Sequence, residues 1–307
     1  MTLQQLRYLI AVAEYGSINK AAASLYASQS NLSTAIKDLE RELGITIFTR
    51  NNRGVALTND GAELVSYARQ VMEQVSMIEE RYSPAQQSFA RLAVSTQHYA
   101  FSLQAFMEVA DRFAGDEYDF ILRETTTAQI ISDVATFRSD AGILYLDSFN
   151  ERVLMKAFAD SHLTFTPLFS ARTHVFMSEK HPLAKSAVLK LEDLADYPRY
   201  SFEQGPSASL YYAEEPLAYL PHSKNIAITD RGTLTNLLAN HSGYTLSTGV
   251  LSEEMHTGIV SIPMEEEITM TVGYLMHSQR NASPLLVAYL EQLREVIRQN
   301  PTVSSQE

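Results

Sequence analysis

Apolar and polar residues alternate with helical spacing through the first 44 residues. In the first segment the apolar positions recur at steps of three or four: Leu3, Leu6, Ile10 and Ala13. This spacing predicts an amphipathic helix that ends at Gly16, and Ser17 is then a natural N-cap for a short alanine-rich helix. A third helix is expected from Ser28 to Gly44. Small alanines let two helices cross closely, as a helix-turn-helix requires.

The third predicted helix has two distinct faces. One face is apolar and consists of Leu32, Ile36, Leu39 and Leu43. The other side carries short polar side chains from the N-cap onward: Ser28, Gln29, Ser30, Ser33, Thr34 and Lys37. A solvated surface explains most polar helical faces, but short hydroxyls are poor helix formers compared with Glu or Lys. They let a helix approach base edges and phosphates, and Gln and Lys suit base readout, so these six residues are candidate DNA contacts.

A hairpin is predicted directly after the third helix. Residues 45–58 read ITIFTRNNRGVALT, in which two β-rich runs flank the turn sequence NNRG. Such a hairpin is a wing, and it carries Arg50 and Arg53. Wing arginines meet phosphates or the minor groove of DNA, and the alternative is two exposed arginines on a loop.

A long helix is predicted next, from the N-cap Thr58 to a point before Pro84. Its apolar residues alternate steps of four and three: Leu64, Ala68, Val71, Val75 and Ile78. This is the heptad pattern of a coiled-coil seam, which implies a partner helix and a dimer that pairs two DNA-reading heads. The alternative is that the stripe packs against the rest of the same chain.

After Pro84 the pattern changes to alternating strands and helices. Strands are expected at 90–96, 118–124 and 141–146, with helices at 101–113 and 128–138, which predicts a parallel sheet covered by helices. Further strands and a helix indicate a second α/β lobe: 163–169, 174–179, 225–230, 233–241, 244–248 and 258–263. Residues 186–198 are expected to form an ordinary capped helix. A strand at 268–276 and an amphipathic helix at 284–297 return to the first lobe.

Hydroxyl side chains gather where two of these strands end. The first strand ends with Ser95, Thr96 and Gln97, and the second is followed by Thr125, Thr126 and Thr127. Helix capping accounts for one hydroxyl at each place, but three consecutive threonines exceed that need. Ligands bind beyond the carboxyl ends of strands in open α/β sheets, and hydroxyls beside helix N-termini suit a small carboxylate or phosphate.

Composition and charge limit the functions that this chain can have. The chain has 307 residues, enough for two or three domains, and a net charge of −12. Residues 1–60 carry six Lys or Arg against five Asp or Glu, so an acidic body follows a nearly neutral head that permits local phosphate contacts. The absence of cysteine excludes thiol chemistry and fits a cytoplasmic protein, and no apolar run is long enough for a membrane.

The order of the predicted head, wing and linker helix resembles that of the LysR-type transcriptional regulators. The family pattern matches Ser28–Gln29, Leu32–Ser33, Leu39–Glu40, Glu42–Gly44, Phe48, Arg50, Leu57–Thr58 and Gly61. Ser30 stands where the family usually has proline, and Thr34 stands where arginine or glutamine is common. Segments of the body, including residues 122–146, look similar to the CpsY-like branch of streptococcal regulators linked to methionine uptake and capsule.

The resemblance implies a fold and a division into domains. The fold is α/β overall, with a winged helix-turn-helix at 1–58 and a linker and dimerisation helix at 59–89. A two-lobed effector domain like the periplasmic binding proteins follows, with lobe I at 90–162 and 268–307 and lobe II at 163–267. By analogy the effector contacts between the lobes are Ser95, Thr96, Gln97, Thr125, Thr127, Phe202, Gln204, Ser247 and Thr248.

The expected function is a DNA-binding transcriptional regulator that responds to a small effector, and not an enzyme. Its partners would be double-stranded promoter DNA, a small anion or amino-acid-like metabolite, and further copies of the chain in a homodimer or homotetramer. No catalytic triad, metal-ligand cluster, phosphate loop or cofactor motif is present in the sequence. Two alternatives remain open: a solute-binding module whose head contacts proteins, and an enzyme fused to a DNA-binding head.

Overall fold

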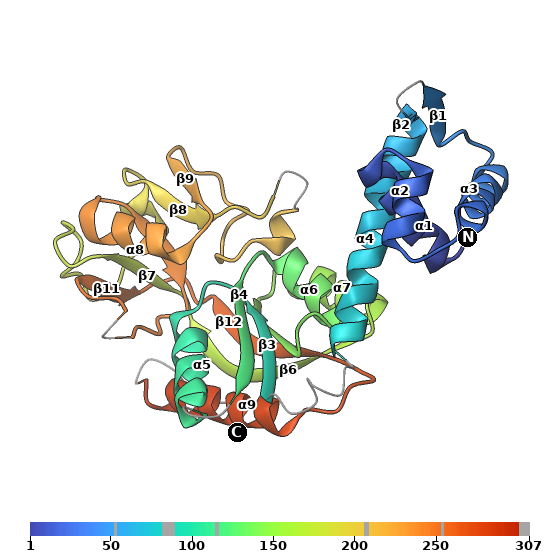
Figure 1. Ribbon diagram of the computed structural model, residues 1–307. Helices are drawn as coiled ribbons and strands as arrows, with labels where there is room; N and C mark the ends of the chain where they lie inside the picture. Colours follow the sequence, from blue (N-terminus) through green and yellow to red (C-terminus); the bar gives the residue numbers. More distant parts are fainter. Residues whose placement is uncertain (52–53, 82–89, 114–116, 206–208, 253–254, 301–307) are drawn as a thin grey trace. The chain divides into compact units, whose positions relative to one another are not determined.

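The computed structural model describes residues 1–307 except for 52–53, 82–89, 114–116, 206–208, 253–254 and 301–307 (Figure 1). The chain divides into two compact units, Met1–Ser88 and Phe89–Glu307. No helix in these described ranges combines the length and the apolar character that a membrane span needs.

The first unit is a three-helix head with a wing and a long helix. Its elements are α1 Leu3–Tyr15, α2 Ile18–Ser24, α3 Gln29–Leu43, β1 Phe48–Asn51, β2 Gly54–Leu57 and α4 Asn59–Arg81. The predicted caps are confirmed: Ser17 Oγ accepts the Lys20 N–H, and Ser28 Oγ accepts the Asn31 N–H. Helix α3 ends at Gly44 with φ 70°, a left-handed conformation that favours glycine.

The core of the head confirms most of the predicted apolar face of α3. Leu32, Ile36 and Leu39 are buried against α1 and α2. The prediction was wrong for Leu43, which is 39% exposed. Leu43 lies in the last turn of α3, directly before the left-handed C-cap Gly44 at which the helix ends. The buried apolar face therefore runs from Leu32 to Leu39, about two turns of the helix.

The wing is held against the head by backbone contacts. The N–H of Val55 donates to the carbonyl of Gly16 at 3.0 Å, and a Cβ on Gly54 would lie 2.3 Å from that same oxygen. Only glycine permits such an approach. At the other end of the hairpin, Glu40 Oε1 accepts the N–H of Ile47 at 2.7 Å. The Leu-Glu pair of the sequence pattern thus joins α3 to the wing.

Helix α4 divides its apolar residues between two faces. Val65 and Ala68 are buried in the core of the head, which corrects the expectation that Ala68 lies on a free seam. Within the first unit, Val71 is 41% exposed and Ile78 is 58% exposed. Ala68 therefore packs on the same chain, and the predicted seam is reduced to the exposed residues Val71 and Ile78.

The second unit begins with a five-stranded sheet in the order β4-β3-β5-β12-β6. Its strands are β3 Ala90–Thr96, β4 Tyr118–Glu124, β5 Ala141–Leu146, β6 Leu163–Arg172 and β12 Thr269–His277. Its helices are α5 Ala100–Arg112, α6 Thr127–Ala135, α7 Glu151–Asp160 and α9 Pro284–Arg298. Strands β3, β4 and β5 are parallel, whereas β12 runs antiparallel to both β5 and β6.

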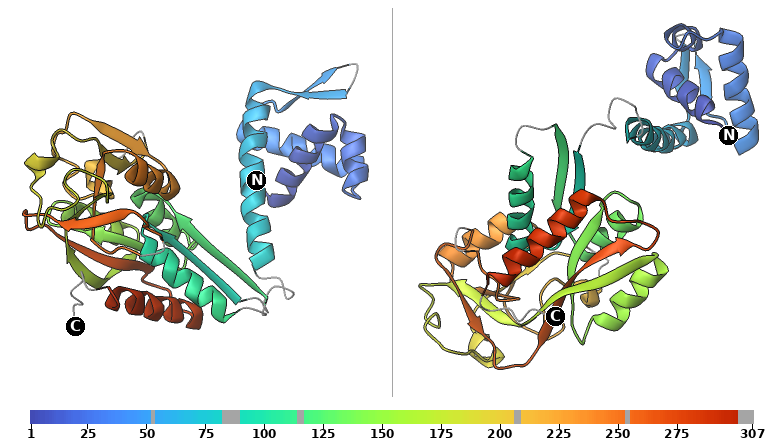
Figure 2. Two further views of the ribbon diagram at one scale, coloured as in Figure 1. Left: turned by 90° about the vertical axis from the view of Figure 1, so that its left-hand side faces the viewer. Right: turned by 90° about the horizontal axis from the view of Figure 1, so that it is seen from below.

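Helices cover both faces of this sheet, and β5 shows why. All six residues of β5 are buried. Ile143 and Tyr145 belong to the core under α5 and α9, whereas Leu144 and Leu146 belong to the core under α6 and α7. Successive side chains of a strand point to opposite faces, so a continuous apolar run fits a strand covered on both sides. Helices α5 and α9 lie side by side on their face (Figures 1 and 2).

The second sheet has the order β11-β7-β10-β8-β9. Its elements are β7 His174–Ser178, β8 Arg199–Phe202, β9 Asn225–Ile228, α8 Arg231–Asn240, β10 Tyr244–Ser247 and β11 Ile259–Pro263. The capped helix expected at 186–198 is reduced to a short 3-10 turn, η2 Leu191–Leu194. A second 3-10 turn, η3 Leu210–Tyr212, precedes β9.

The chain crosses between the two sheets at Thr173. Strand β6 stays in the first sheet as far as Arg172, so lobe II begins near Thr173 and not at residue 163. The Thr173 N–H donates to the Ile268 carbonyl at 2.9 Å, and the Thr173 carbonyl accepts the Met264 N–H at 3.1 Å. The two crossing segments are therefore hydrogen-bonded to each other at the point where the lobes join.

Candidate functional site

The first candidate site is the polar side of α3. Its described side chains are accessible: Gln29, Ser30, Thr34 and Lys37 are exposed, and Ser33 is half-buried. Ser28 is also exposed, and its hydroxyl already accepts the Asn31 N–H at 3.2 Å, so its structural role is to cap the helix. The residues predicted to read DNA share one accessible surface at the N-terminal half of α3, as insertion into a major groove requires.

One exposed aromatic residue near α3 was missed in the sequence. Tyr26 lies in the turn between α2 and α3, is fully exposed, and has a positive φ of 51°. A positive φ in a non-glycine residue is uncommon and favours a tight turn. The sequence YAS indicated a turn at this position. A single aromatic residue in a turn, however, has no helical or strand periodicity from which its exposure could be predicted. Of the wing arginines, Arg50 lies in β1, and Arg53 lies outside the described residues.

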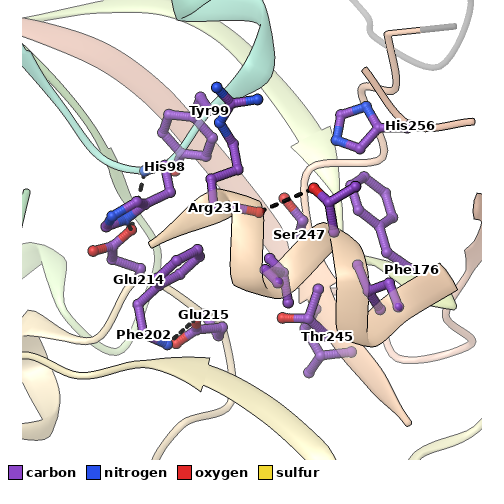
Figure 3. Close-up of a pocket in the computed structure, with 14 residues that line it drawn as sticks. His98, Tyr99, Phe176, Phe202, Glu214, Glu215, Arg231, Thr245, Ser247 and His256 are labelled. Atoms are coloured by element: carbon purple, nitrogen blue, oxygen red, sulfur yellow. Dashed lines mark hydrogen bonds and ion pairs between the residues drawn. The ribbon is translucent and has the colours of Figure 1, made fainter. Parts of the chain in front are cut away.

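The second candidate site lies between the two sheets of the second unit. His98, which follows β3, stacks on Phe202 at the end of β8 with ring centroids 3.8 Å apart and an interplanar angle of 5° (Figure 3). Beside this pair lies Glu214, whose Oε2 accepts the His98 N–H at 3.1 Å and lies 2.8 Å from His98 Nδ1. His98 and Glu214 are almost completely buried, with 6% and 4% of their side chains exposed.

Three of the predicted effector residues join this cluster through hydrogen bonds. Gln97 Nε2 donates to Thr127 Oγ1 at 2.7 Å, and the Thr127 N–H donates to Gln204 Oε1 at 3.0 Å. Gln204 Nε2 then donates to Glu214 Oε1 at 2.9 Å. A continuous chain of hydrogen bonds therefore runs from lobe I to lobe II. Sequence reasoning identified Gln97, Thr127 and Gln204 but not Glu214, the acceptor at its end.

Four other predicted effector residues lie in different surroundings: Ser95, Thr96, Thr125 and Thr248. Ser95 is fully buried, and its hydroxyl bonds to Asp133 and Ser139, both in lobe I. Thr96 Oγ1 donates to the neighbouring Gln97 carbonyl. The Thr125 N–H bonds to the Thr96 carbonyl, and Thr248 Oγ1 accepts the Val250 N–H. Thr126, which lies between two predicted contacts, caps α6.

A small cavity of about 40 Å³ adjoins the His98–Phe202 pair. Among the described residues that line it, Phe202 and Ser247 were predicted from the sequence. The others include Glu214, Glu215, Arg231 and His256 (Figure 3). Ligand pockets commonly measure about 300–1,000 Å³, so this form of the cleft holds only a few water molecules. A separate hollow of about 340 Å³ in lobe II is lined by Arg199, Tyr244 and His222 among others.

Charges at the cleft are arranged in pairs. Arg231 Nε donates to Glu124 Oε1 at 2.7 Å, which links α8 in lobe II to the end of β4 in lobe I. Burial lowers the pKa of His256 to about 4, so its imidazole is neutral at physiological pH. Arg231 and His256 were not singled out because one lies at a helix start and the other in a loop, where no periodicity indicates the direction of a side chain.

Glu215 is a buried carboxyl group with a raised pKa. Burial is the main cause and the charge of Glu214 adds to it, and together they raise the pKa of Glu215 to about 8. The Phe202 N–H, which donates to Glu215 Oε1 at 2.8 Å, and the Arg199 guanidinium oppose the shift. Arg199 is itself buried and donates to the carbonyls of Pro216 and Leu217. Glu215 is therefore mainly protonated at neutral pH.

The chain thus consists of a helix-turn-helix head and a body of two sheets with polar groups between the sheets. The family profile described as bacterial regulatory helix-turn-helix protein, lysR family, matches residues 3–62. The profile of the LysR substrate binding domain matches residues 96–298. This chain belongs to the LysR family of transcriptional regulators. It is a LysR-type DNA-binding regulator with an effector-binding domain, as the resemblance implied.

Several curated LysR relatives align over most of this chain. The DNA-binding transcriptional dual regulator OxyR of Escherichia coli K12 is 28% identical over 307 residues, which cover 97% of this chain and 95% of that protein. The regulator CysB of Haemophilus influenzae is 25% identical and covers 84% of this chain and 78% of its own length. These relatives are regulators and not enzymes, so the interpretation as a fused enzyme is set aside.

Solved structures of LysR regulators align along the chain as well. A full-length, singly substituted OxyR from Pseudomonas aeruginosa is 24% identical, with a TM-score of 0.48, and the alignment covers 96% of this chain and 99% of that one. The two matching profiles describe a DNA-binding helix-turn-helix and a domain that binds a small molecule.

Proposed function

We propose that this LysR-type regulator binds a small effector between its two lobes and converts the occupancy of the cleft into altered promoter binding. The observation that carries the proposal is the hydrogen-bonded chain from Gln97 through Thr127 and Gln204 to Glu214, because it joins both lobes at the cleft. An effector shifts an equilibrium between lobe arrangements only by as much as its affinities for them differ. Polar donors that belong to both lobes provide such a difference.

The DNA contacts proposed for the head are Ser28, Gln29, Ser30, Ser33, Thr34, Lys37, Arg50 and Arg53. The exposure of Gln29, Thr34 and Lys37 on one side of α3 supports the proposal. Ser30 and Thr34 replace the residues that are usual in the family pattern, so they are the positions where this chain would differ in operator preference. The proposed site of action is the cytoplasm, where promoter DNA is accessible.

The proposed effector is a small anion or an amino-acid-like metabolite, and the proposed targets are genes of amino-acid uptake or metabolism of the methionine type. The resemblance to the CpsY-like branch suggests the targets, and the amide and N–H donors at Thr127 and Gln204 suit a carboxylate. A thiol-based signal is excluded for this chain because it contains no cysteine. The proposed effector contacts are Ser95, Thr96, Gln97, Thr125, Thr127, Phe202, Gln204, Ser247 and Thr248.

Specific binding to the DNA upstream of its own gene tests the proposal. We expect the full chain to bind this DNA at least about 1,000-fold more tightly than a scrambled duplex, with an affinity that falls steeply as salt rises. Fluorescence anisotropy across a salt series measures the affinity for each duplex and its salt dependence. A thermal-shift screen of amino acids and sulfur metabolites tests which of them bind as effectors. Equal, weak binding to both duplexes would refute the regulator and favour a solute-binding module whose head contacts proteins.

The open face of α4 predicts how the chain self-associates. Replacing Ile78 with glutamate puts a charge on a residue that is 58% exposed in the isolated unit. If this face forms the dimer seam, each copy loses the burial of one isoleucine, about 1.5–3 kcal/mol, and the dimer weakens at least 10-fold. Sedimentation velocity at several protein concentrations measures the effect. The matched control is Gln70→Glu, which makes the same charge change at an exposed position of the same helix away from this stripe. Equal behaviour of the two variants would contradict the seam.

A further inference from the structure

Glu214 uses both of its carboxylate oxygens to hold the cleft together. Oε2 accepts the His98 N–H and contacts His98 Nδ1, whereas Oε1 accepts Gln204 Nε2. Its side chain is 4% exposed. A carboxylate buried to this extent is stable only when nearly all its oxygens are hydrogen-bonded. The site around Glu214 is therefore a carboxylate receptor, and the chain fills it with its own side chain.

The backbone that carries Glu214 is anchored independently of that carboxylate. Phe149 of lobe I stacks between Tyr211 and Tyr219, with ring centroids 4.5 and 4.2 Å away. Arg199 donates to the carbonyls of Pro216 and Leu217. Since these contacts lie on both sides of Glu214 in the sequence, its side chain is able to rotate out of the receptor without release of the whole segment.

The charged and titratable groups around Glu214 make it unfavourable in free energy to keep the Glu214 carboxylate in this position. Glu215 adjoins it in the sequence, and the two carboxyl groups repel each other when both are ionised. The cation Arg231 faces the same cavity but is paired with Glu124, and Arg199 bonds to backbone carbonyls. His98, Tyr99 and His256 complete the titratable groups that line the described part of the cavity. Two of the residues around Glu214 bond directly to its carboxylate. His98 lines the cavity, and the uncharged Gln204 is the second partner.

We propose that Glu214 is an internal ligand, and that the effector is a small carboxylate which displaces it from the His98 N–H and the Gln204 amide. This inference rests on the proposed effector role of the cleft and adds the chemical class of the ligand and the residue that it replaces. The cavity of about 40 Å³ is then the space left when Glu214 is in place. Rotation of Glu214 adds the volume of its own side chain to that space.

The competition has a direct consequence for affinity. A tethered carboxylate competes at a high effective concentration, so the effector binds the native chain more weakly than it binds an emptied receptor. Removing the side chain at residue 214 makes the receptor available to free carboxylates. Acetate, which matches the end of a glutamate side chain, is the probe for that receptor.

Thermal unfolding of the full-length Glu214→Ala variant in sodium acetate, against sodium chloride at equal ionic strength, tests the inference. We expect acetate to raise the melting temperature of this variant by about 3 °C at ten times its dissociation constant, and logarithmically at higher concentrations, because it refills the receptor. The native chain should respond to acetate no more than to chloride. The matched control is Glu203→Ala, which removes the same charge from an exposed position of the same segment.

A distance measurement keeps the inference testable if Glu214→Ala does not fold. The chain has no cysteine, so Ser132→Cys on α6 and Asn236→Cys on α8, both at exposed positions, accept a spin-label pair across the lobes. We expect Glu214→Gln to broaden the label distances, because a neutral amide accepts the His98 N–H less strongly than a carboxylate does. Acetate should restore the native distances in Glu214→Ala.

Two results would overturn the inference. One is an equal acetate response in Glu214→Ala and Glu203→Ala, which would be a general salt effect. The other is a Glu214→Gln chain with the native distance distribution. Either result leaves the regulator itself intact, because specific promoter binding is measured separately. The opposite combination is also informative. If acetate stabilises Glu214→Ala but no metabolite changes DNA binding by the native chain, the carboxylate receptor is supported and the proposed effector role is refuted.

Discussion

Replacing Gln29 with alanine should lower the affinity of the full chain for its operator by about 10- to 100-fold, the cost of one lost bidentate base contact. Gln29 is exposed in the first turn of α3, where recognition helices contact base edges. Binding to scrambled DNA should change by less than about 3-fold, since non-specific affinity depends on phosphate contacts. The specificity ratio, and not the affinity alone, should therefore fall.

Two further variants separate base readout from other effects. Arg53→Ala in the wing should weaken binding to operator and scrambled DNA alike and reduce the salt dependence by about one ion. Arg41→Ala, at the far end of α3 and paired with Asp38, should leave both affinities nearly unchanged. Fluorescence anisotropy with the two duplexes measures all three variants, and circular dichroism confirms that each head is folded. A uniform loss in Gln29→Ala would remove this residue from base readout.

Raising the pH from 6 to 8 should destabilise the native chain relative to a Glu215→Gln variant by about 2 kcal/mol. The folded-state pKa of Glu215 is raised to about 8, well above that of an unfolded glutamate near 4.3. The folded chain therefore holds this proton more tightly than the unfolded chain does. The resulting stability is fully present below about pH 4 and is lost as the pH rises through 8.

Glutamine at position 215 imitates the protonated acid and keeps an oxygen for the Phe202 N–H. We expect the difference in melting temperature between Glu215→Gln and the native chain to grow by about 5 °C in favour of the variant between pH 6 and pH 8. Differential scanning calorimetry at both pH values measures the difference. The control is Glu203→Gln, an exposed residue whose melting curve should follow the native chain at each pH. Parallel pH dependences for Glu215→Gln and the native chain would show that Glu215 is ionised throughout.

The local structure of the head was readable because it depends on short-range spacing. Apolar residues three and four apart put Leu32, Ile36 and Leu39 on one face of α3, and the caps at Ser17 and Ser28 need only the next three residues. The continuous apolar run of β5 likewise indicates burial on both faces. Periodicity does not say how far a neighbouring element extends, which is why Leu43 and Ala68 were misjudged.

By itself the sequence determined the family, the order of the elements and the polar side of α3. Only the tertiary structure decided which hydroxyls at the strand ends reach the cleft. The Ser95 hydroxyl bonds to Asp133 in lobe I, while the Thr127 hydroxyl accepts from Gln97 and the Thr127 backbone N–H donates to Gln204. The tertiary structure also brought Glu214 to His98, 116 positions apart in the chain. The physical reason is that a loop side chain has no periodicity, so its partner is set by long-range packing and the need to bond a buried carboxylate.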